Sequence, residues 1–250
     1  MFAQLNTELL GHIDYEQTVN DVWGYVANGH EYALLGTRTG TAIIDVTDPA
    51  NPTELFFVPG PSSLWRDMKV WNNYAYVTNE TDSGLHVFDL QYLPDSIQVW
   101  NWTGDIFMGD TVNMTSAHNV FIDENGIAYI FGSNYGVGGA IMIDVNANPI
   151  NPPIVGIYNQ RYVHDGFVRG DTLWTAEIYA GRFAVIDVTN KANPVIMATQ
   201  NTPFAFAHNC WLSDDGNTFI TTDEKSNAPI TIYDVSDITD IKELAQYRSN

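Results

Sequence analysis

The chain is poor in basic residues and contains a single cysteine. Only 10 of its 250 residues are Lys or Arg, against 30 Asp or Glu, which leaves a formal net charge of −20. Such a charge repels nucleic-acid phosphates and anionic membrane surfaces, so we expect no nucleic-acid partner. Cys210 cannot form an intrachain disulfide, and no run reaches the roughly 20 apolar residues that a membrane-spanning helix needs. We therefore predict no transmembrane segment in this chain.

What is present favours short strands. Charged residues make up 16% of the chain and aromatic residues 13%, while Gly and Pro are spread along it. This composition is typical of many strands joined by turns rather than of helices linked by salt bridges. The length fits one large all-β domain spanning residues 1–250.

A repeat runs through the sequence. Apolar segments that end in Asp recur about every 45 residues as TAIIDV, LHVFDL, AIMIDV, FAVIDV and ITIYDV. Turns such as TDPANP and TNKANP follow, and a short strand comes after each turn. We expect the repeated carboxylates to cap backbone N–H groups of these turns. They belong to Asp45, Asp89, Asp144, Asp187 and Asp234.

Each repeat has room for four strands. A first strand begins near a polar pair such as His-Asn, a tight turn and a second strand follow, and the third strand ends at the repeated Asp. Four antiparallel strands in about 45 residues are typical of one blade of a β-propeller. We predict an all-β propeller with five blades in this chain. The predicted blades span residues 20–60, 61–110, 111–160, 161–203 and 204–250.

One strand is in excess. Residues 5–15 resemble the outer strand of a blade, yet the fifth repeat already has its own outer strand, KELAQY. In propellers an N-terminal strand often completes the last blade. We therefore expect these five blades to be part of a six- or seven-bladed ring, with the chain truncated at its C-terminus.

Polar residues recur where the first strand of each blade begins. In a propeller this strand lines the central channel, so equivalent residues should surround the channel mouth. Aligning the repeats places Val22 with Arg66 and three histidines, and the next position is mostly Asp or Asn. The predicted ligand-binding residues are Trp23, Arg66, Asp67, His118, Asn119, His164, Asp165, His208 and Asn209.

Carboxylates at the ends of the second strands suggest a metal site. The candidate ligands are His118, His164, His208, Glu80, Glu177 and Asp223. Histidines with carboxylates suit a transition metal, whereas carboxylates with Asn carbonyls suit calcium. The alternative is structural, because a side chain that repeats with the blade can bond the neighbouring blade.

Other residues leave similar alternatives open. Arg66 could form an ion pair or recognise an anionic ligand. Trp23 and Trp65 could pack between blades or stack on a sugar. Cys210 is expected to be a buried core thiol. No catalytic residue is assigned.

The segments IIDVTDPANP and FAVIDVTNKANP, with HN or HD leading three blades, resemble the LVIVD-repeat proteins, specifically the choice-of-anchor B family. The resemblance implies a secreted bacterial β-propeller attached to the cell surface. It implies no particular reaction, and a surface glycan or a protein is the expected partner.

Three functions fit these observations. The favoured one is a ligand-binding or protein-interaction module that uses the polar ring at the channel mouth. A metal-dependent enzyme of the lactonase, phosphodiesterase or oxidase kind, with a divalent ion at the same place, is the alternative. A structural component of a surface assembly is the third, so whether the protein is an enzyme stays open.

Overall fold

The computed structural model describes residues 7–248, which form five four-stranded antiparallel sheets and one two-stranded hairpin. The predicted all-β fold of four-stranded blades is confirmed. The first two sheets are β1 (Val19–Ala27), β2 (His30–Thr37), β3 (Gly40–Asp45) and β4 (Thr53–Pro59), and β5 (Met68–Trp71), β6 (Tyr74–Val77), β7 (Leu85–Asp89) and β8 (Gln98–Trp102). The hairpin is β9 (Ile106–Phe107) and β10 (Asp110–Thr111).

The other three sheets follow the same strand order. The third is β11 (Asn119–Ile122), β12 (Ile127–Phe131), β13 (Ala140–Asp144) and β14 (Ile154–Tyr158). The fourth is β15 (Asp165–Arg169), β16 (Thr172–Glu177), β17 (Arg182–Asp187) and β18 (Val195–Asn201), with the short 3-10 helix η1 (Ile178–Ala180) after β16. The fifth is β19 (Ala207–Leu212), β20 (Thr218–Asp223), β21 (Ile230–Asp234) and β22 (Lys242–Tyr247).

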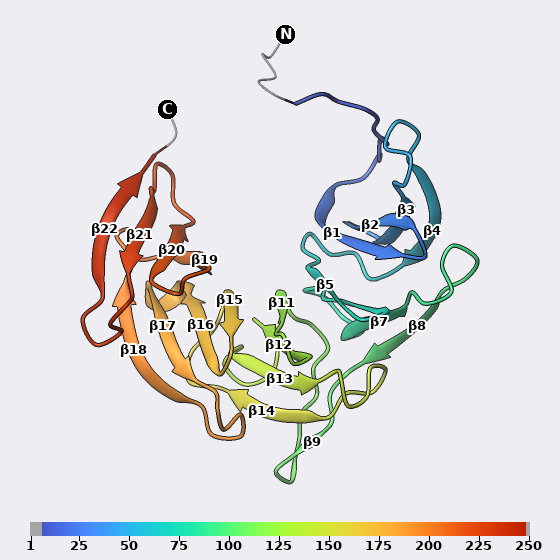
Figure 1. Cartoon of the computed structure of the whole chain (residues 1–250). Helices are drawn as coiled ribbons and strands as arrows, with labels where there is room; N and C mark the ends of the chain where they lie inside the picture. Colours follow the sequence, from blue (N-terminus) through green and yellow to red (C-terminus); the bar gives the residue numbers. More distant parts are fainter. Residues whose placement is uncertain (1–6, 249–250) are drawn as a thin grey trace.

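We call these sheets blades 1 to 5. Their first strands lie side by side, with β1 next to β5, then β11, β15 and β19, and the blades fan outward from this inner row in an open arc (Figure 1). Four apolar clusters fill the spaces between successive blades. One contains Phe167, Phe183 and Phe219, and it also holds Cys210, which is confirmed as a buried core thiol. The core therefore lies between the sheets.

The repeated Asp residues close the turn after the third strand, as predicted. Asp45 accepts a hydrogen bond from the Thr47 amide at 2.9 Å, and Asp187 accepts one from the Thr189 amide at 2.8 Å. Asp89, Asp144 and Asp234 make equivalent bonds to amides two or three residues later. Hydrogen bonds from Thr47 keep the pKa of Asp45 below its usual range.

Residues before β1 pack on blade 1. The Tyr15 hydroxyl donates to Glu54 at 2.5 Å, and Gly11 lies against the backbone of Pro49 and Ala50. Residues 7–18 form no strand, and the predicted segment 5–15 begins outside the described residues. That this segment is the outer strand of a closing blade stays a prediction. The six- or seven-bladed ring also stays a prediction. No helix among the described residues is long and apolar enough to cross a membrane.

Candidate functional site

A cavity of about 320 Å³ lies where the first strands of blades 3, 4 and 5 begin. We call it the channel-mouth cavity. Its polar lining includes His118, His164 and His208, together with Glu80 and Glu224. The three predicted histidines are therefore brought to one place. Their rings form a row, with centroids 4.1 Å apart between His118 and His164 and 4.3 Å apart between His164 and His208.

Strand pairing positions the histidines. The His118 and His164 amides donate to carbonyls of the second strand in their own blades, those of Phe131 and Ala176. In blade 5 the register shifts between Ala207 and Asn209, so His208 is the extra residue of a β-bulge. A bulge redirects a side chain relative to regular alternation. The three imidazoles thus occupy equivalent positions in successive blades.

Two of the imidazoles have fixed orientations. His118 Nδ1 lies 2.6 Å from Glu80 Oε1, and His164 Nδ1 lies 3.1 Å from the His208 carbonyl oxygen. A carbonyl can only accept, so Nδ1 of His164 carries the proton and Nε2 has a free lone pair. Burial, reinforced by the neighbouring His118 and His208, lowers the pKa of His164 to about 3. Burial also lowers the pKa of His208, so both rings are neutral at pH 7.

The structure adds one carboxylate to the predicted set. Glu224 is exposed, and one of its oxygens, a nitrogen of His164 and a nitrogen of His208 all lie within 4.8 Å of one another. The prediction chose its neighbour Asp223. Asp223 is buried and instead accepts hydrogen bonds from Thr202 Oγ1 and the amides of Phe204 and Phe206. The acidic pair Asp223-Glu224 at the end of β20 is the signal in the sequence, and it is Glu224 rather than Asp223 that faces the histidines.

Glu177 and Arg66 also differ from the prediction. Glu177 is fully buried between the Tyr158 hydroxyl and Arg182 Nε, each at 2.6 Å, so it is not free to bind a metal. Arg66 is buried with its guanidinium bonded to the carbonyl oxygens of Thr37 and Pro61, and it does not line the channel-mouth cavity. It therefore holds the β4–β5 loop rather than an anionic ligand.

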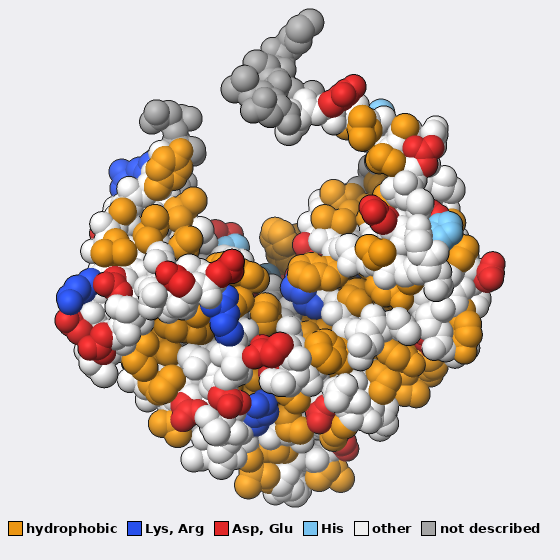
Figure 2. Space-filling view, in the orientation of Figure 1, with side chains coloured by type: hydrophobic (Ala, Val, Ile, Leu, Met, Phe, Trp, Pro, Cys, Tyr) orange, Lys and Arg blue, Asp and Glu red, His pale blue; other side chains and the backbone are white. Residues whose placement is uncertain are grey.

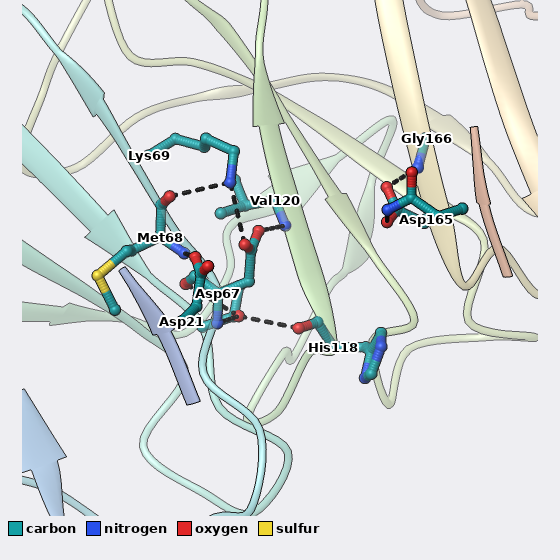
Figure 3. Close-up of polar contacts among 10 residues, drawn as sticks. Asp21, Asp67, Met68, Lys69, His118, Val120, Asp165 and Gly166 are labelled. Carbon is teal, nitrogen blue, oxygen red and sulfur yellow. Dashed lines mark hydrogen bonds and ion pairs between the residues drawn. The ribbon is translucent and has the colours of Figure 1, made fainter. Parts of the chain in front are cut away.

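A second layer of polar residues lies one position further along the strands. Asn119 and Asp165 line both the channel-mouth cavity and a neighbouring cavity of about 250 Å³, which also contains Asp67, Asn209 and Trp23. Asp67 bonds the Val120 amide at 2.8 Å and Lys69 Nζ at 3.0 Å, on the opposite side of β11 from Asp165 (Figure 3). Burial raises the pKa of Asp67 to about 6 and that of Asp165 to about 7.

The second layer ties blades together. Asp67 joins blade 2 to Val120 of blade 3, and Asn209 of blade 5 donates to Asp165 of blade 4. Trp23 is partly exposed, and Lys69 Nζ lies 4.4 Å from its ring centroid. The space-filling view shows that the arc is open along its inner edge (Figure 2). The structural alternative therefore fits these Asp and Asn positions. It also fits His118, which bonds Glu80 of blade 2, and His164, which bonds the His208 carbonyl of blade 5.

Comparisons with known proteins agree with this architecture. Residues 25–58 and 178–202 match the LVIVD repeat. No match was found among curated protein sequences. These two matches support the resemblance to LVIVD-repeat proteins noted in the sequence. The choice-of-anchor B assignment stays a prediction.

Solved structures share the fold at low sequence identity. A functionally unknown protein from Desulfotomaculum acetoxidans has a TM-score of 0.65 at 12% identity, over 96% of this chain and 74% of that one. The periplasmic gluconolactonase PpgL of Pseudomonas aeruginosa has a TM-score of 0.63 at 11% identity, over 96% and 73%. The Cps50 (Swd1) β-propeller domain from Myceliophteria thermophila has a TM-score of 0.59 at 10% identity, over 92% and 75%. The chain therefore has a β-propeller fold and carries LVIVD repeats.

Proposed function

We propose that the protein is a binding module that holds a divalent metal ion in the channel-mouth cavity. One observation carries the proposal: His164, His208 and Glu224 each offer a ligand atom, and these atoms lie within 4.8 Å of one another. Ligands about 2.0–2.2 Å from one zinc ion lie roughly 3.4 Å apart. Glu224 is exposed, so rotation of its side chain can close the remaining gap.

The imidazoles have the properties of metal ligands. Both His164 and His208 are neutral at pH 7 because burial lowers their pKa values. The Nδ1 of His164 donates to a backbone carbonyl, an arrangement that commonly orients metal-binding histidines. Two nitrogens and one carboxylate oxygen suit zinc or another first-row ion rather than calcium. Three protein ligands leave a coordination position open for a ligand.

One contact favours an enzyme as the second candidate. His118 is held by Glu80 at 2.6 Å, and its ring is next to that of His164. An imidazole oriented by a carboxylate beside a metal site can accept a proton from metal-bound water. Metal-assisted hydrolysis is the reaction class that these residues fit. Secretion and attachment to a cell surface stay predictions that rest on the resemblance alone.

Zinc binding tests the proposal. Protein stripped with a chelator is expected to take up one zinc ion per chain, measured by calorimetry and elemental analysis. His208→Ala and Glu224→Gln each remove one ligand, so zinc affinity should fall at least about tenfold in each. His12→Ala, which changes an exposed histidine outside the cavity, is the matched control and should bind as the wild type does.

Two results would contradict the proposal. One is the absence of stoichiometric zinc in the folded wild-type protein. The other is unchanged affinity in both ligand variants, which would place the ion elsewhere. Circular dichroism of each variant should show that the β-sheet content is retained, so that loss of zinc is not loss of folding.

A further inference from the structure

Two exposed aromatic side chains border the channel-mouth cavity. Trp65 and Tyr179 both line it, and they are 53% and 76% exposed. Trp65 lies in the loop before blade 2, and Tyr179 lies in η1 of blade 4, so they flank the position of His118 in blade 3. Single exposed aromatic residues are common on protein surfaces, but two that flank one polar cavity suggest a ligand surface.

The backbone holds each aromatic residue in place. The buried Ser63 hydroxyl donates to the Trp65 carbonyl at 2.7 Å and accepts from the Glu80 amide at 3.1 Å. The Tyr179 turn is closed by Gly181, whose φ of 66° favours glycine and whose amide donates to the Ile178 carbonyl. Rigid aromatic side chains lose little entropy when a ligand stacks on them.

Neighbouring aromatic rings orient the side chains of Trp65 and Tyr179. Tyr179 packs on Tyr162 with centroids 4.9 Å apart, and Trp65 meets the edge of His118 at 6.5 Å. Both supporting rings also line the cavity. Their aromatic surfaces therefore adjoin the carboxylates of Glu80 and Glu224 and the proposed metal site.

A cavity that combines aromatic surfaces with carboxylates and a metal site suits a ligand with a hydroxylated ring. A sugar offers an apolar C–H face for stacking, and its hydroxyl groups can donate to carboxylates and coordinate a metal ion. The net charge of −20 disfavours phosphorylated ligands of similar shape. The cavity of about 320 Å³ is at the small end of ligand pockets, so it accommodates a single ring.

We infer that the channel-mouth cavity binds one neutral sugar residue. The ring stacks on Trp65 or Tyr179, and its hydroxyl groups contact Glu80, Glu224 and the metal ion. The inference deepens the proposed function, because the metal supplies one of the contacts. It names the ligand class as a neutral carbohydrate.

Binding of methyl glycosides of glucose, galactose, mannose and N-acetylglucosamine tests the inference. Saturation-transfer NMR and calorimetry on the zinc-loaded protein are expected to detect at least one of them. At least one of Trp65→Ala and Tyr179→Ala should weaken that binding at least about tenfold, and both should leave zinc affinity as in the wild type. Tyr92→Ala, which removes a half-exposed tyrosine outside the cavity, should leave sugar binding unchanged.

The outcomes separate this inference from the metal proposal. Zinc uptake with no glycoside binding, or glycoside binding that survives both aromatic variants, would overturn the carbohydrate inference alone. Glycoside binding that needs Trp65 or Tyr179 in a protein that takes up no zinc would support the carbohydrate site and overturn the metal proposal. A loss of folding in Trp65→Ala is checked by Trp65→Phe, which should keep both folding and part of the binding.

Discussion

Replacing Glu177 with alanine is expected to lower the free energy of unfolding by about 3 kcal/mol. The carboxylate is fully buried and accepts hydrogen bonds from Tyr158 and Arg182, both at 2.6 Å. Its removal leaves the buried Tyr158 hydroxyl and the partly buried guanidinium without their partner. Denaturant unfolding followed by tryptophan fluorescence measures the loss.

The same variant separates a structural carboxylate from a metal ligand. Glu177→Ala should bind zinc with the wild-type stoichiometry in its folded fraction, because Glu177 does not line the channel-mouth cavity. Glu224→Gln is the reciprocal variant, with a near-normal free energy of unfolding and weakened zinc binding. Loss of zinc from folded Glu177→Ala, with no loss of stability, would show that Glu177 is a ligand after all.

Replacing His86 with leucine is expected to stabilise the protein at pH 4 by about 2–3 kcal/mol relative to the wild type. His86 is buried, and its Nε2 has no hydrogen-bond partner. Burial and the nearby Arg66 lower its pKa to about 4, from about 6.5 in an unfolded chain. Replacing His86 with an apolar side chain therefore breaks no hydrogen bond at Nε2.

The sign of the pH effect follows from proton binding. Between pH 6.5 and pH 4 the unfolded chain takes up a proton at His86 and the folded protein does not, so acid favours unfolding. The free energy of unfolding of the wild type therefore falls as the pH drops from 6.5 to 4. His86→Leu carries no titrating group at this position and does not show this fall. Urea unfolding at pH 8, 6, 5 and 4 should show stability curves that coincide at pH 8 and separate below pH 6.5. His12→Leu, at an exposed site, is the control, and parallel curves for His86→Leu and wild type would contradict the prediction.

The repeat made most of the fold predictable. Each repeat has four apolar segments and an Asp at a constant position. These features predict the strand order and the turn positions, because strands follow local alternation and turns follow local hydrogen bonding. The same alignment placed His118, His164 and His208 together, because residues at one position of the first strand share one level of the channel.

The carboxylates at the strand ends were harder to predict. Glu177 and Asp223 are the last residues of β16 and β20, where nearby bonding partners as well as alternation decide which side chain turns inward. Glu177 turns toward the boundary between blades 3 and 4, where Tyr158 of blade 3 and Arg182 of blade 4 bind it, and Asp223 is held by three groups of the 202–206 loop. Glu224 is left to face the histidines. These outcomes depend on residues 5 to 21 positions away and on loop geometry that the repeat does not encode.

The turn after each third strand bears on how such a protein can change over evolutionary time. Asp45, Asp89, Asp144, Asp187 and Asp234 each accept a hydrogen bond from an amide of their own turn. The further contacts of Asp45 with His30 and of Asp234 with the Ser236 hydroxyl stay within the same blade, so each blade corner is complete without help from its neighbours. Gene segments encoding whole blades can therefore be duplicated without rebuilding a corner. Three imidazoles on three successive blades are what such duplication would produce. The matching positions of blades 2 and 1 carry Arg66 and Val22, so the three imidazoles are confined to one sector of the arc.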